Sequence, residues 1–193
     1  MSWESSDPSR AWRRAFWFVL LVVASVVFSF AFACATPFAA FAAAAACMSP
    51  RRDAVMLSIG VWLANQGIGF AFLGYPWTWN CAAWGVALGL SAVSATLTVD
   101  RVVGRLGHAH AIARYAAALA AAFVAYEAVL IVSSLGLGGT GNFTPVIQAR
   151  IFTINAGVLV GLVALQRLGI AVGIASPSRL PFPAPTRTVD LMT

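Results

Sequence analysis

Long uncharged stretches alternate with short polar connections along this chain. The connections contain turn-forming sequences such as GYPW at 74–77 and GLGGTGNFTP at 136–145. Four apolar stretches, two of them holding one ionisable residue each, are long enough to cross a hydrocarbon core as helices. They cover residues 54–74, 77–99, 115–135 and 145–166.

The first uncharged stretch, residues 15–50, poses a problem of length. A single helix over these residues would be roughly 54 Å long at ~1.5 Å per residue, against a hydrocarbon core of ~30 Å. The part after Pro37 is too short before Ser49 for a second complete crossing. Length alone therefore leaves open whether the chain crosses once or twice here.

The arginines decide between one and two crossings. All twelve basic residues are arginine, and with two crossings eleven of them fall on one side of the membrane. With one crossing, Arg51 and Arg52 move to the other side, and the arginines are distributed over both sides of the membrane. Because basic residues gather on the cytoplasmic side, we expect two elements that turn near Thr36, which would cap the second helix, and Pro37, which would occupy its first position. The second helix must then be short or partly re-entrant.

The composition agrees with a membrane protein. Hydrophobic residues make up 61% of the 193 positions and charged residues 9%, against ~25% charged in soluble domains. We predict an all-α polytopic protein with six transmembrane segments in a bacterial inner membrane, both termini being cytoplasmic. The expected organisation is a cytoplasmic segment 1–14, a membrane domain 15–174 and a disordered tail 175–193. The net charge of +6 is interpreted as topology and not as nucleic-acid binding.

Two ionisable residues lie inside predicted spans, where a charge is costly unless it is paired or hydrated. Glu127 is in the fifth span and Arg150 is one turn into the sixth. Their similar depth on consecutive helices would allow an ion pair. A ligand-facing role, and an Arg150 side chain that extends to the interface, are the other interpretations.

Further polar and aromatic residues gather in the same half of the predicted bundle. The third span presents amides and an indole on one face, the next connection is aromatic, and the sixth span repeats an amide after seven residues. The candidate ligand-binding set is Trp62, Asn65, Gln66, Trp77, Trp79, Asn80, Glu127, Gln148, Arg150 and Asn155. Aromatics with a few convergent polar groups are typical of a small-molecule pocket, whereas amides in a bundle can also serve as interhelical hydrogen bonds.

Other chemistry has little support in the sequence. His108 and His110 form a pair without a third ligand, so we interpret them as part of a basic loop and expect no metal and no cofactor. Cys34, Cys47 and Cys81 form no CxxC pair and are expected to be packing residues, with a disulfide or ligand role as the alternative. No hydrolytic residue set occurs in the spans, so we do not expect an enzyme.

The order of segments from TPFAAFAAAAACMSPRRDAVMLSIGVWL to GIGFAFLGYP resembles the substrate-capture subunits, or S components, of energy-coupling factor vitamin transporters, the biotin-binding members above all. The similarity covers roughly residues 32–89. It implies six helices, an outward-facing pocket, and as partners a transmembrane coupling subunit with two ATPases. The alanine pattern by which such subunits dock occurs here only at 31–35 and 39–43, later than the first helix where the family has it.

Together these features predict a subunit in the lipid bilayer that binds a small molecule, such as a vitamin or cofactor precursor, for uptake. An accessory or scaffold subunit of a larger membrane complex is the alternative, because a small alanine-rich bundle would also serve that role. The sequence does not name the substrate.

Overall fold

The chain folds into helices that run alternately in opposite directions. The structure is a computed structural model that describes residues 12, 15–16, 19–24, 36–106 and 109–172, and within these residues it contains no β-strand. The helices are α2 (Phe38–Met48), α3 (Arg51–Ala71), α4 (Trp79–Arg105), α5 (Ala111–Leu137), the 3₁₀ turn η1 (Thr140–Asn142) and α6 (Pro145–Ala171). The predicted all-α class is confirmed.

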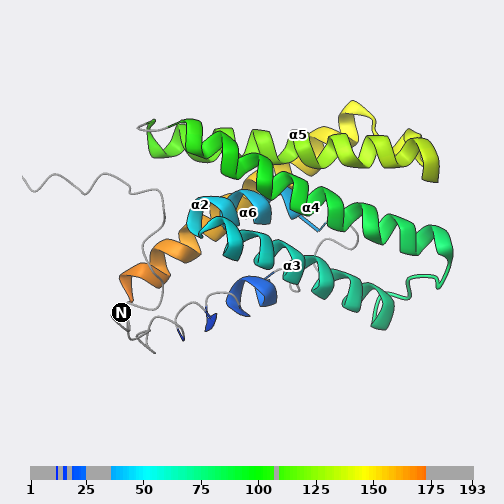
Figure 1. Cartoon of the computed structure of the whole chain (residues 1–193), viewed down its shortest axis with the longest axis horizontal. Helices are drawn as coiled ribbons and strands as arrows, with labels where there is room; N and C mark the ends of the chain where they lie inside the picture. Colours follow the sequence, from blue (N-terminus) through cyan, green and yellow to red (C-terminus); the bar gives the residue numbers. More distant parts are fainter. Residues whose placement is uncertain (1–11, 13–14, 17–18, 25–35, 107–108, 173–193) are drawn as a thin grey trace, which may run out of the picture.

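Four of these helices are long and apolar enough to cross a membrane, namely α3, α4, α5 and α6. They lie lengthwise in Figure 1, and each reverses the direction of the one before it. This is the architecture of a polytopic membrane protein. The described part of the first predicted span, residues 19–24, is helical and places Leu21 in the core.

The antiparallel arrangement gives the bundle two distinct ends. At one end of the bundle α3 and α5 begin and α4 and α6 finish. We call it the arginine-rich end, because most of the described arginines lie there. Its arginines are Arg51, Arg52, Arg101, Arg105, Arg114 and Arg167. The opposite, arginine-poor end carries the α3–α4 connection and η1, with Arg150 as its single arginine among the described residues.

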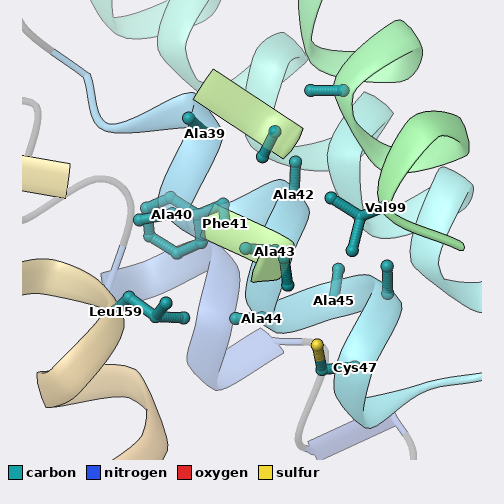
Figure 2. Close-up of a cluster of buried hydrophobic side chains, with 14 of the residues drawn as sticks. Ala39, Ala40, Phe41, Ala42, Ala43, Ala44, Ala45, Cys47, Val99 and Leu159 are labelled. Atoms are coloured by element: carbon teal, nitrogen blue, oxygen red, sulfur yellow. The ribbon is translucent and has the colours of Figure 1, made fainter. Parts of the chain in front are cut away.

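The short helix α2 lies at the centre of the bundle. All eleven of its residues are buried, and it packs against α3, α4, α5 and α6. Figure 2 shows its alanines between Val99 of α4 and Leu159 of α6. Alanine lets helices approach closely where apolar attraction between helices is weak in lipid, which explains the run of alanines from Ala42 to Ala46. The predicted short second helix is thus confirmed.

The start of α2 differs from the sequence prediction. Pro37 occupies the N-cap position, one place earlier than expected, and no side chain of the segment itself caps the helix. Instead the backbone N–H of Ala40 donates to Oδ1 of Asn155 on α6 at 2.8 Å. The Oγ1 of Thr36, which was expected to cap the helix, accepts from Nδ2 of Asn65 on α3. At membrane depth no water satisfies a free N–H, so neighbouring helices supply the partners.

Helix boundaries were otherwise predicted to within a few residues, with one exception. The basic loop expected between the fourth and fifth spans is largely helical, because α4 continues to Arg105 and α5 begins at Ala111. No proline interrupts this segment, so the helices extend beyond the apolar region into polar sequence. The N-terminal segment 1–14, apart from Trp12, and the tail 175–193 lie outside the described residues, as do Cys34 and His108.

Candidate functional site

A cavity of about 280 Å³ lies in the arginine-poor half of the bundle. Its walls come from α4, α5, α6, the loop at η1 and the residue that precedes Pro37. The lining residues are Thr36, Trp84, Leu88, Tyr126, Glu127, Leu130, Asn142, Phe143, Ile147, Gln148 and Ile151.

The position of this cavity follows from the length of α2. Eleven residues give a helix of about 16 Å at ~1.5 Å per residue, roughly half of a ~30 Å hydrocarbon core. Because α2 is joined to α3 at the arginine-rich end, it fills the bundle only on that side. Thr36 lies next to the N-terminal end of α2 and lines the cavity. The cavity therefore begins beyond the N-terminal end of this helix. Interrupted or short helices also build the midplane sites of many transporters.

Glu127 is the acidic side chain of the cavity lining. It is 7% exposed, and neither oxygen of its carboxyl group has a hydrogen-bond partner. The Oε1 of Gln148, which lines the same cavity, also has none. Gln148 is the polar side chain with which the carboxyl interacts, but the contact does not reach hydrogen-bonding geometry. Three acceptor oxygens without a hydrogen-bond partner thus belong to two residues that line one small cavity.

The ion pair between Glu127 and Arg150 that similar depth would allow is not formed. Arg150 is exposed whereas Glu127 is buried, and the carboxyl oxygens of Glu127 have no partner. The reason lies in helix geometry: Arg150 is two residues after Gln148, which places the two side chains on nearly opposite faces of α6. Since Gln148 faces the cavity, Arg150 faces away from it.

The predicted residues on α3 lie outside the cavity lining, and each makes a hydrogen bond within the protein instead. The indole Nε1 of Trp62 donates to the carbonyl oxygen of Gly85 on α4 at 2.8 Å. The amide of Gln66 donates to Oδ1 of Asn65 at 3.4 Å, and Asn65 in turn donates to Thr36. This chain of amides ends at Thr36 in the cavity wall, so it positions that wall rather than facing a ligand directly.

The other predicted residues also occupy structural positions. Trp77 and Trp79 are each 86% exposed at the arginine-poor end, where indole rings are enriched in membrane proteins. Asn80 donates to the carbonyl oxygen of Leu137 at 3.1 Å and joins α4 to the end of α5. Asn155 caps α2. Of the ten predicted site residues, the structure therefore brings together Glu127 and Gln148 in the cavity.

Sequence reasoning missed the aromatic and aliphatic walls of the cavity. Trp84 and Leu88 are one helical turn apart on α4, a spacing that places both on one face and could have marked them. Tyr126 adjoins Glu127 in the sequence, and its ring stacks on Phe38 of α2 with centroids 6.2 Å apart. No local signal marks Phe143, because its place depends on how the loop after α5 folds back over the bundle.

A metal site is not evident in the part of the chain that the structure describes, since no three or more His, Cys, Asp or Glu side chains cluster there. Cys47 is buried in α2 and is not disulfide-bonded. Compared with known proteins, the chain matches no family model, no curated protein and no solved structure. Its class is therefore defined by the fold: an all-α, multi-pass membrane protein with a half-length central helix and a cavity beyond it.

Proposed function

We propose that this protein is a membrane-embedded subunit that captures a small molecule for uptake and holds it in the cavity beyond α2. The observation that carries the proposal is the set of unpartnered acceptors, Glu127 and Gln148, in the lining of a partly open cavity between apolar helices. Buried polar groups of a structural bundle are normally hydrogen-bonded, and an intramembrane carboxyl is costly. A ligand that meets these groups would account for their presence.

The volume of the cavity agrees with a small ligand. At about 280 Å³ it lies near the lower end of the ~300–1,000 Å³ that is common for ligand pockets. A molecule the size of a vitamin fragment or cofactor precursor fits this space, whereas a complete nucleotide cofactor would be too large. Most of the lining is apolar, with a few polar groups that would fix the orientation of the ligand.

The direction of capture follows from the arginines. The arginine-rich end would face the cytoplasm by the positive-inside rule, so the cavity would open toward the outer side of a bacterial inner membrane. There it would meet substrate from outside the cell. This orientation would agree with the predicted cytoplasmic position of both termini.

The proposed mode of action is that of an S component. In that arrangement, which the segment at 32–89 resembles, a transmembrane coupling subunit and two ATPases would drive release of the bound molecule. The protein itself would supply binding, and its partners would supply energy.

The test is to identify small molecules that purify with the protein in detergent. Leu88 lines the cavity, and Leu90, on the same helix, is 59% exposed. Leu88→Trp should fill the cavity, whereas Leu90→Trp makes the same change on the outer surface and serves as the matched control. We expect mass spectrometry to find one compound, in roughly stoichiometric amount, with the wild type and with Leu90→Trp, and little or none with Leu88→Trp.

Two results would contradict the proposal. A compound that Leu88→Trp retains fully would place its site elsewhere. A scaffold subunit would instead be supported if no compound purified with the protein and if the wild type and Leu88→Trp formed complexes with other membrane proteins equally well.

A further inference from the structure

We propose that the ligand of this cavity carries a protonated nitrogen, as in an amine or amidine, which binds to Glu127, and an apolar body that lies against the aromatic wall. This inference rests on the proposed function, because it names the chemical class of the captured molecule.

The buried polar atoms of the cavity lining that lack a hydrogen-bond partner are all acceptors. Both carboxyl oxygens of Glu127 and Oε1 of Gln148 are buried without a hydrogen-bond partner. A ligand that satisfies them must contribute donors. Two or three N–H groups on one nitrogen centre, or on an amidinium, match three acceptor oxygens in a small space.

The described part of the protein provides no positive charge for Glu127. Arg150 is exposed on the far side of α6, and the other described arginines are at the arginine-rich end, beyond the length of α2. An isolated carboxylate in an apolar medium is strongly unfavourable. A cationic ligand would remove this imbalance through charge-assisted hydrogen bonds, which are about twice as strong as neutral ones.

The remaining walls favour a flat or apolar body. Trp84, Tyr126 and Phe143 supply aromatic surface, and Leu88, Leu130 and Ile151 supply aliphatic surface. Aromatic faces attract cations as well as apolar groups, so the same wall is compatible with a charged head. A volume of about 280 Å³ accommodates one ring together with a small head group.

Three probes of nearly the same shape separate the effect of charge from that of size. Benzamidine is cationic, benzamide is neutral and benzoate is anionic, and each has one ring and one planar head group. Binding to the purified full-length protein in detergent can be followed by tryptophan fluorescence, since Trp84 lines the cavity. We expect benzamidine to bind with an affinity roughly ten- to a hundredfold higher than benzamide, the range for a hydrogen bond to a charged group. Benzoate should not bind measurably.

Glu127→Gln tests the role of the carboxyl, because glutamine keeps the shape of the side chain and removes its charge. The preference for benzamidine over benzamide should disappear in this variant. Asp53→Asn, at the start of α3 in the arginine-rich end, removes an equal charge away from the cavity and should keep the preference. Circular dichroism spectra would show that both variants are folded.

The outcomes distinguish this inference from the proposed function. If benzamide or benzoate binds as tightly as benzamidine and Leu88→Trp abolishes all binding, the ligand need not be cationic. The cavity would then remain the proposed capture site. A purified compound without a basic nitrogen would have the same consequence. A preference for benzamidine that persists in Glu127→Gln would overturn the assignment of Glu127. Binding of all three probes that Leu88→Trp leaves unchanged would contradict the proposed function itself.

Discussion

Replacing Gly89 by alanine should destabilise the bundle, although alanine is the better helix former. Gly89 lies inside α4, and a Cβ atom added there would be 2.7 Å from Cε2 of Trp62 and 3.0 Å from Nε1. Real Cβ atoms do not approach ring atoms so closely, so the indole must move. It is held in place, however, by the 2.8 Å hydrogen bond from Nε1 to the carbonyl oxygen of Gly85.

The magnitude follows from three contributions. Overpacking of a well-packed contact costs about 1–3 kcal/mol, and losing the Trp62 hydrogen bond costs about 0.6 kcal/mol, the average in membrane bundles. Replacing a helical glycine by alanine contributes about 0.8–1.0 kcal/mol in the opposite direction. The free energy of unfolding should therefore fall by about 0.6–2.8 kcal/mol. Gly104→Ala, in the same helix with no atom within 4 Å of the added Cβ, should instead raise it by up to about 1 kcal/mol.

The assay is reversible unfolding in mixed micelles with increasing dodecyl sulfate, followed by circular dichroism. A double mutant cycle with Trp62→Phe identifies the cause, because phenylalanine has a smaller ring without Nε1 and without the fused second ring of the indole. In that background the loss caused by Gly89→Ala should become much smaller. If Gly89→Ala and Gly104→Ala change stability equally, or if Trp62→Phe does not reduce the loss, the close contact between α3 and α4 is not what requires glycine.

Two further predictions concern the cap of α2 and the orientation in the membrane. Asn155→Ala should lower the free energy of unfolding by about 0.5–1.5 kcal/mol, because the Ala40 N–H keeps only its 3.1 Å contact with the carbonyl oxygen of Pro37. The control Thr153→Ala removes an exposed hydroxyl that is bonded to its own helix at Ala149 and should have little effect. Equal losses for both variants in the same unfolding assay would argue against the cap. A reporter fused after Arg52 should be active on the cytoplasmic side, and a periplasmic signal there would mean that residues 15–50 cross the membrane once.

The helices were predictable because their signals are local. Apolar length and turn residues fix α3 to α6, and the distribution of arginines requires a turn before Arg51. The exact start of α2 was not predictable, since the groups that satisfy it come from Asn155, 115 residues away along the chain. Such a partner is defined only when α6 is packed beside α2.

The sequence predicted in which half of the bundle the candidate site lies, but not most of the residues that line it. Intramembrane polarity drew attention to Glu127, which lines the cavity, because an ionisable residue in a span has few purely structural reasons to be present. The amide signal was ambiguous: Asn65 and Asn155 satisfy other polar groups, whereas Gln148 faces the cavity. The sequence around each of these residues does not distinguish the two roles, because they depend on the rotation of each helix about its axis.

The half-length of α2 links the fold to the proposed function. A full-length helix at the centre of the bundle would fill the space beyond Thr36 and leave no cavity, and Glu127 would then lie buried in protein without room for a ligand. A missing helix would leave a much wider space, open at both ends. An eleven-residue helix of mostly small side chains fills the centre of the bundle toward the arginine-rich end, and the cavity of about 280 Å³ lies beyond its N-terminal end. The proposed binding subunit would need access from one side only, and a molecule that reached Glu127 would meet the buried alanines of α2 on the path to the opposite end.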